Sequence, residues 1–189
     1  YGEPGPLETA ICLRVEPGSN FPTVSEALAA DGAISSPAIF RMGAEYAGKA
    51  DALKAGSFLV PEGASMAEIT DIVTRGGAST CGTEIVFRIG IASSEIQLRE
   101  LDPTTQRFVT RAEFAPDAES LPDDYTRLRD AAGTRFRISI AEGATNWQIV
   151  DALNKVDFLA GGVSSLPEEG RLAPDSYEVV RGAERGALV

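Results

Sequence analysis

The stretch Ser139-Ile140-Ala141-Glu142-Gly143-Ala144 has two counterparts earlier in the chain, Arg14-Val15-Glu16-Pro17-Gly18-Ser19 and Leu59-Val60-Pro61-Glu62-Gly63-Ala64. In each copy an apolar residue lies three positions before the glycine, and apolar residues follow six, nine and ten positions after it. The last three positions share one face of a helix, and glycine permits a tight turn. Each copy therefore predicts a strand, a turn and an amphipathic helix, with an N-cap at Ser19, Ser65 or Thr145.

The sequence around the first copy predicts a complete small unit. Residues 10–15 have the pattern of a strand, and residues 23–30 that of a short helix. Ser36 and Pro37 are typical of an N-cap and a first helical position, so a second helix is expected to run to about residue 47. Residues 57–60 close the unit as a second strand. The expected order is strand, helix, helix, strand.

The middle of the chain is richer in strand-forming residues. Residues 83–91 contain many β-branched side chains, which favours a strand. Residues 94–101 and 107–114 flank a turn and predict a hairpin, and residues 124–132 predict a helix. We therefore expect an α+β fold of small β-α units with no large parallel sheet, in which residues 81–133 form a β-rich insertion.

The composition excludes several kinds of chemistry. The 189 residues include 17 basic and 28 acidic side chains, which gives a formal net charge of −11, and there is no histidine. A strongly acidic chain disfavours nucleic acid as a partner. Without histidine, any acid–base chemistry must use carboxylates, lysine or tyrosine. No cofactor motif and no metal-ligand motif is present, so we expect neither a cofactor nor a bound metal.

The two cysteines, Cys12 and Cys81, match no metal or redox motif. They could pair in an oxidising compartment, but we favour two free buried thiols. The chain starts at Tyr1 and ends at Val189 within an expected helix. We therefore expect both ends to be cut, with a targeting or anchoring segment absent from the N-terminal side.

Three stretches together resemble the YceG-like family, the MltG endolytic murein transglycosylases. They are Gly32-Ala33-Ile34-Ser35-Ser36-Pro37 followed by Leu53-Lys54-Ala55-Gly56-Ser57-Phe58, then the third repeat with its helix through Val150, and finally Glu169-Gly170-Arg171-Leu172-Ala173-Pro174-Asp175-Ser176-Tyr177. The last stretch is similar to the family's "EG-x-L-x-PDTY" signature and is the most specific of the three.

The resemblance implies an architecture and a function. It implies that residues 1–80 contain a LysM-like subdomain and that residues 134–189 begin an α/β catalytic domain. Because that domain continues further in the family, we expect this chain alone to be inactive. The resemblance also implies a lyase anchored in the inner membrane through an absent N-terminal segment and facing the periplasm. Its partners would be peptidoglycan glycan strands and proteins of cell-wall synthesis.

By the same motif, Glu169 matches the family's catalytic glutamate. Lytic transglycosylases need one carboxyl group that acts first as an acid and then as a base. Such a group must be protonated near neutral pH, so Glu168 and Asp175 are candidate neighbours that raise its pKa. Leu166, Leu172 and Pro174 are candidates for an apolar wall, although Asp175 also fits a structural turn.

The aromatic side chains near this motif allow two interpretations. Trp147 and Tyr177 could stack on a sugar, but we expect Trp147 to pack between helix and sheet and Tyr177 to fill core.

Two further functions stay open at this point. One is a non-catalytic module that binds peptidoglycan or serves as a scaffold for the cell-wall machinery. The other is a pyridoxal-phosphate aminodeoxychorismate lyase, an older label of the family, which would need a Schiff-base lysine and a phosphate-binding loop. Lys49, Lys54 and Lys155 are the only lysines, and none adjoins a glycine-rich phosphate loop. This second function is therefore disfavoured.

Overall fold

The computed structural model describes residues 1–76, 79–168 and 172–188. The chain divides into two compact units, Tyr1–Gly82 with Leu101–Arg107 and Thr83–Glu100 with Phe108–Val189. Each unit has its own hydrophobic core. The two units are described separately below.

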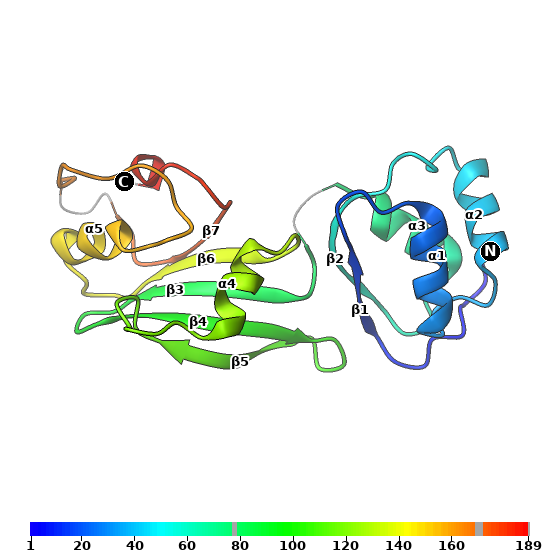
Figure 1. The fold of residues 1–189 in the computed structure, drawn as a ribbon, viewed down its shortest axis with the longest axis horizontal. Coiled ribbons are helices and arrows are strands. Elements are labelled where there is room, and N and C mark those ends of the chain that lie inside the picture. Colours follow the sequence, from blue (N-terminus) through cyan, green and yellow to red (C-terminus); the bar gives the residue numbers. More distant parts are fainter. Residues whose placement is uncertain (77–78, 169–171, 189) are drawn as a thin grey trace. The chain divides into compact units, whose positions relative to one another are not determined.

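The first unit has the expected order of strand, helix, helix, strand, followed by a third helix. Its elements are β1 (Ile11–Val15), α1 (Phe21–Ala30), α2 (Pro37–Tyr46), β2 (Gly56–Val60) and α3 (Met66–Thr74). The strands β1 and β2 pair antiparallel, with Leu13 opposite Phe58. Figure 1 shows the three helices on one side of this two-stranded ribbon. The buried side chains Leu13, Val15, Phe58 and Val60 lie in the core with them.

The three repeats form the expected turns between strand and helix. Their glycines have positive φ angles that favour glycine, 82° at Gly18, 66° at Gly63 and 84° at Gly143. Ser65 and Thr145 are the N-caps of their helices, each within a capping box. In the first copy Asn20, and not Ser19, is the N-cap, because its side chain accepts a hydrogen bond from the Thr23 backbone N–H.

Two of the three helical apolar positions are buried in every repeat. The residues six and ten positions after each glycine are buried in all three copies: Val24 and Leu28, Ile69 and Val73, and Ile149 and Leu153. The ninth position varies, since Ala27 is exposed, Ile72 is half-buried and Ala152 is buried. Two of the three positions therefore determine which face of the helix packs against the core.

The second unit contains a five-stranded mixed sheet. Its elements are β3 (Thr83–Ile89), β4 (Ser94–Asp102), β5 (Arg107–Phe114), α4 (Asp123–Asp130), β6 (Arg135–Ile140), α5 (Asn146–Asn154), β7 (Ser176–Val179) and a 3₁₀ helix (Arg185–Leu188). The strand order is β5-β4-β3-β6-β7, in which β3 and β6 run parallel. The fold is α+β, as expected. The hairpin and the helix expected before residue 133 are present as β4–β5 and α4.

The strands of residues 83–114 thus lie in one sheet with β6 and β7. The domain limits expected at residues 80 and 133 stay predictions.

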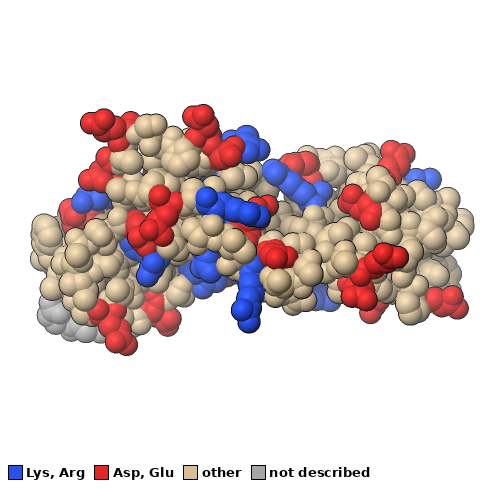
Figure 2. Space-filling model, turned by 90° about the horizontal axis from the view of Figure 1, so that it is seen from below, with Lys and Arg blue, Asp and Glu red and all other residues tan. Residues whose placement is uncertain are grey.

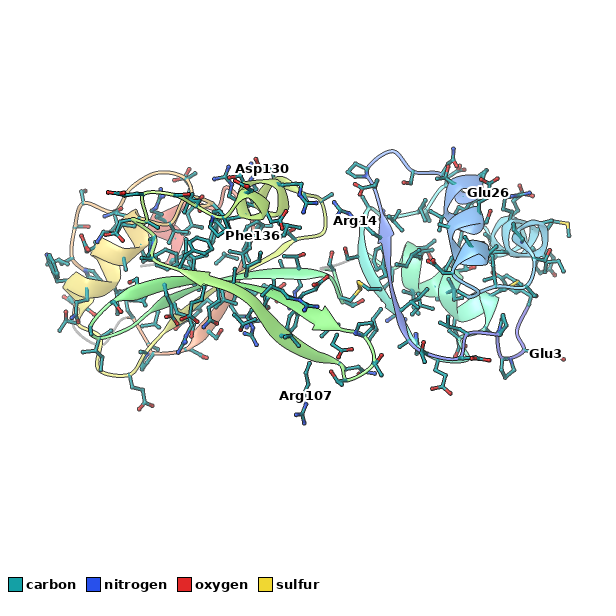
Figure 3. The ribbon with its side chains drawn as sticks, turned by 60° about the horizontal axis from the view of Figure 1, so that its bottom comes forward. Glu3, Arg14, Glu26, Arg107, Asp130 and Phe136 are labelled. Carbon is teal, nitrogen blue, oxygen red and sulfur yellow. A yellow bond between two sulfur atoms is a disulfide. The ribbon has the colours of Figure 1, made fainter. Side chains whose placement is uncertain are left out.

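The core of the second unit lies on one face of the sheet. The β3 side chains Ile85, Phe87 and Ile89 face it, together with apolar residues of α4 and α5. Figure 3 shows both helices on the same side of the sheet. Tyr125 of α4 is fully buried and donates a hydrogen bond of 2.7 Å to Asp157 Oδ1. Burial and this bond raise the pKa of Tyr125 above its usual range.

The opposite face of the sheet is polar, and a buried carboxylate lies on it. The Glu84 side chain is only 3% exposed. Its Oε1 lies 3.2 Å from Arg137 Nε, and its Oε2 lies 3.6 Å from an Arg99 guanidinium nitrogen. Because these arginines come from β6 and β4, Glu84 links the central strand β3 to both of its neighbours.

Cys12 and Cys81 form a disulfide with their Cα atoms 5.9 Å apart (Figure 3). The prediction of two free thiols is therefore wrong. The backbone N–H groups of Thr80 and Cys81 donate to the Ser57 carbonyl at 2.9 and 3.2 Å. Because β2 pairs with β1, these bonds bring Cys81 next to Cys12, a contact between segments 69 residues apart.

The surface carries many acidic side chains. Figure 2 shows them spread over both units on the face that it displays. Among the described residues, no helix is both long and apolar enough to cross a membrane.

Removing the disulfide should destabilise the first unit. The bond closes a loop of 69 residues, so the variant Cys12→Ser/Cys81→Ser is expected to lose about 2–4 kcal/mol of unfolding free energy. Urea denaturation of the oxidised and reduced protein measures this loss. The double variant is the control, since a reductant should not shift its midpoint. Equal midpoints for the oxidised and reduced wild type would contradict the prediction.

Replacing Glu84 should destabilise the second unit. Glu84→Ala leaves two arginines without their buried partner, so we expect a loss of about 2–3 kcal/mol, measured by chemical denaturation. Glu100→Ala is a matched control, because the Glu100 side chain is 51% exposed and pairs with Arg111. That exposed pair should contribute less than about 1 kcal/mol. Losses of similar size in both variants would refute the role given to Glu84.

Candidate functional site

The candidate site begins where the two parallel strands end. The strands β3 and β6 finish at Ile89 and Ile140, which are paired in the register. The Ala141 N–H donates to the Ile89 carbonyl at 2.9 Å and extends the pairing by one bond. The carboxyl ends of parallel strands lie at one edge of a sheet. The turn after β3 and the Gly143 turn that leads into α5 therefore meet at this edge.

A capping box joins the start of α5 to the turn after β3. The Thr145 N–H donates to Gln148 Oε1 at 2.8 Å, which orients the Gln148 amide. The Nε2 group of that amide then donates to the Ile91 carbonyl at 2.7 Å. The Gln148 side chain thus accepts from a backbone N–H at the start of α5 and donates to the turn after β3.

The predicted catalytic residue Glu169 lies outside the described residues, but the segment before it is described. Asn146, the first residue of α5, is buried and donates from Nδ2 to the carbonyls of Pro167 and Glu168, both at 3.1 Å. Earlier in this segment, the Val163 N–H donates to Asn154 Oδ1, and Asn154 Nδ2 donates to the Val163 carbonyl. Side chains of α5 therefore hold this segment at two places. The hydrophobic pattern of α5 gives no signal for this role of Asn146.

The segment that follows is also attached to the second unit. Leu172 packs partly buried against the core. The Asp175 carbonyl accepts from the Ile140 N–H at 2.8 Å, and its carboxylate accepts from the Ser176 N–H at 2.7 Å. The chain bends at Pro174 and Asp175, where the turn is expected. Tyr177 donates to the Ala173 carbonyl at 2.9 Å.

The predicted surroundings of Glu169 are mostly exposed where they are described. Glu168, Asp175, Leu166 and Pro174 all lie at the surface, and Leu172 alone of the predicted apolar wall is partly buried. Tyr177 is 37% exposed, so the expectation that it fills core is wrong. It belongs to β7, which lies at one edge of the sheet.

Trp147 does not pack between helix and sheet, because its side chain is 64% exposed. The buried face of α5 is formed by Asn146, Ile149, Val150 and Leu153, at the spacing of one helical stripe. Trp147 points away from that stripe. It lines a cleft of about 350 Å³ together with the turn after β3 and the segment after β5.

Charged side chains also line this cleft. Lys155 Nζ lies 2.7 Å from Asp151 Oδ2, one turn apart on α5, and Asp117 also lines the cleft. The bond to Asp151 and the nearby charge of Asp117 raise the pKa of Lys155. Lys155 is therefore charged at neutral pH. In the described part of the chain, no group of three or more Cys, Asp or Glu side chains is placed to hold a metal ion.

Removing the Asn146 amide should loosen the segment before Glu169. Asn146→Ala deletes both bonds to the carbonyls of residues 167 and 168, so amides of residues 163–168 should exchange with solvent roughly tenfold faster. Hydrogen exchange with mass spectrometry measures this rate. The amides of β3 serve as an internal control and should exchange at the wild-type rate. Unchanged exchange at 163–168 would show that Asn146 does not hold the segment.

One of the comparisons with known proteins found a match. No curated protein and no solved structure matches this chain. The model of the YceG-like family matches residues 13–189, which includes most of the first compact unit, all of the second and the stretch around Glu169. The chain belongs to the YceG-like family.

Proposed function

We propose that this chain is part of an endolytic peptidoglycan transglycosylase that cleaves the β-1,4 bond between N-acetylmuramic acid and N-acetylglucosamine. The observation that carries the proposal is the family match over residues 13–189. Within it, Glu169 begins a motif that resembles the family's signature, and Glu169 is the proposed catalytic residue.

The proposed reaction uses one carboxyl group in two protonation states. Protonated Glu169 gives its proton to the glycosidic oxygen as the bond between that oxygen and the anomeric carbon breaks. The 6-hydroxyl oxygen of the muramic residue then bonds to the anomeric carbon and gives its proton back to the carboxylate. The products are a 1,6-anhydro end and a free 4-hydroxyl. No water is consumed, so a second carboxylate to activate water is not needed.

The anchoring of the neighbouring segments supports this role. A catalytic acid must be held in a fixed place relative to the bond that it cleaves. The carbonyls of Pro167 and Glu168 are bonded to Asn146, and the Asp175 carbonyl is bonded to the backbone of β6. The chain is therefore bonded to α5 before Glu169 and to β6 after it.

We also propose that the protein acts in the cell envelope, held to the inner membrane by a segment outside this chain. The disulfide between Cys12 and Cys81 supports an oxidising compartment such as the periplasm. The strand, helix, helix, strand order of the first unit supports a LysM-like role in holding glycan strands.

A second candidate function is a scaffold for other cell-wall proteins. One observation favours it: Ile39, Met42 and Tyr46 of α2 are exposed large hydrophobic side chains. They lie three and four positions apart and thus form one stripe on the helix. Exposed apolar stripes of this kind are typical of protein–protein contacts.

The test is cleavage of purified glycan strands by the full-length protein. Wild type should release 1,6-anhydro muropeptides from internal positions, detected by chromatography with mass spectrometry. Glu169→Gln cannot donate the proton and should lose at least about a hundredfold in rate. Glu119→Gln is the matched control, because it removes an exposed carboxylate outside the signature motif and should keep wild-type activity.

Two results would contradict the proposal. Activity of Glu169→Gln equal to that of Glu119→Gln would remove Glu169 from the reaction. Strand binding without cleavage by the wild type would favour the scaffold.

A further inference from the structure

We infer that the cleft beside α5 is a binding site for one sugar ring of a β-1,4-linked N-acetylhexosamine strand, with Trp147 as the surface on which the ring stacks. The identity of the strand rests on the proposed function. The existence of the site rests on the geometry of the cleft itself.

The first argument is the position of Trp147. Burying a large apolar side chain stabilises a folded protein, and an exposed tryptophan does not make that contribution. Trp147 is 64% exposed although Ile149 and Val150, its neighbours on α5, are buried. Its helix is fixed by a capping box and by the bond from Gln148 to Ile91. The indole is therefore presented to solvent from a rigid base.

The second argument is an apolar partner in the same cleft. Ile91, from the turn after β3, is 58% exposed and also lines the cleft. Its Cδ1 atom lies 3.2 Å from the place where a Cβ atom would stand on Gly143. The absence of a side chain at Gly143 thus lets Ile91 lie close over this turn. An indole and an aliphatic side chain together suit the C–H face of a pyranose ring.

The third argument is the set of polar groups that line the same cleft. Asp117 and Asp151 provide carboxylate acceptors, and Lys155 provides an ammonium donor. Sugar hydroxyls both donate and accept hydrogen bonds, so a neutral sugar satisfies both kinds of group. Two carboxylates against one ammonium leave a net negative charge, which disfavours phosphate or nucleotide ligands. The cleft volume of about 350 Å³ lies within the range of small-molecule sites.

The place of the cleft connects it to the glycan strand. Trp147 follows Asn146, whose amide holds the carbonyls of residues 167 and 168. The first turn of α5 thus carries an aromatic platform on its outer face and the anchor of the segment that leads to the signature motif on its inner face.

Trp147 is the only tryptophan of the chain, so its fluorescence reports on this cleft alone. We would titrate the 189-residue chain carrying Glu169→Gln, which prevents cleavage, with the β-1,4-linked N-acetylglucosamine tetramer and with strands of purified peptidoglycan glycan. Saturable quenching or a blue shift of the emission is expected with both ligands. Asp117→Asn and Asp151→Asn keep the tryptophan and should weaken the apparent affinity several-fold through lost hydrogen bonds.

Variants of Trp147 are tested by calorimetry. Trp147→Ala should weaken binding about tenfold, whereas Trp147→Phe should retain most of the affinity because it keeps an aromatic face. Val180→Ala is the matched control, since Val180 is 77% exposed in the same unit and does not line the cleft. Thermal unfolding of every variant shows that the fold is retained, and the Phe variant separates stacking from folding.

The inference is overturned if calorimetry detects binding but Trp147 fluorescence stays constant, because the strand then binds elsewhere. It is also overturned if Trp147→Ala binds as tightly as Val180→Ala. The cleavage assay is independent of both results. Cleavage by the full-length wild type without binding at Trp147 refutes the cleft and leaves the proposed function standing. Binding at Trp147 without cleavage supports the cleft and refutes the transglycosylase.

Discussion

The parallel pairing of β3 and β6 is the constraint on which the second unit depends. It joins Ile89 to Ile140 and continues through the bond from the Ala141 N–H to the Ile89 carbonyl. Because both strands end at the same edge, the turns that follow them are neighbours. The start of α5, the Ile91 turn and the cleft between them are consequences of this pairing. A shift of one residue in the register would turn Arg137 toward the core and Ile138 toward solvent, so the alternation of apolar and polar residues maintains the pairing.

The two faces of the sheet stabilise the pairing in different ways. On one face α4 and α5 cover the apolar side chains of β3 and β6. On the other face Glu84 accepts from Arg137 and faces Arg99, so the central strand is tied to both neighbours by charge-assisted contacts.

At the far end of α5, Arg185 donates to the carbonyls of Leu153, Val156 and Gly161. A cation at a helix C-terminus is favourable. The helix is therefore fixed at both of its ends.

Local features were predictable from the sequence, and contacts between distant segments were not. The glycine turns, the N-caps at Ser65 and Thr145 and the hairpin depend on a few adjacent residues, so their patterns predict them. The disulfide depends on the Ser57 carbonyl holding Cys81 beside β1, and composition gives no sign of that. Trp147 was predicted to be buried because tryptophan usually is, but the buried position at the start of α5 belongs to Asn146, whose amide satisfies two backbone carbonyls. Glu169 lies outside the described residues, so its role stays a prediction.

Helix geometry and hydrogen bonding explain why Asn146 is buried and Trp147 is exposed. Successive residues on an α-helix point about 100° apart, so with Asn146 on the buried face of α5 the next side chain, Trp147, points away from it. Burying a polar amide is tolerated when it is hydrogen-bonded, and Asn146 makes two such bonds, to the carbonyls of Pro167 and Glu168. Exposing an indole has no comparable compensation in the free protein, and a ligand that covers the ring would supply it. One helical turn thus positions the segment before the proposed catalytic acid and presents a surface for the proposed substrate. Asn146 and Trp147 both lie between Thr145 and Gln148, the two residues of the capping box. The backbone of α5 therefore sets the distance between the segment that Asn146 holds and the Trp147 side chain.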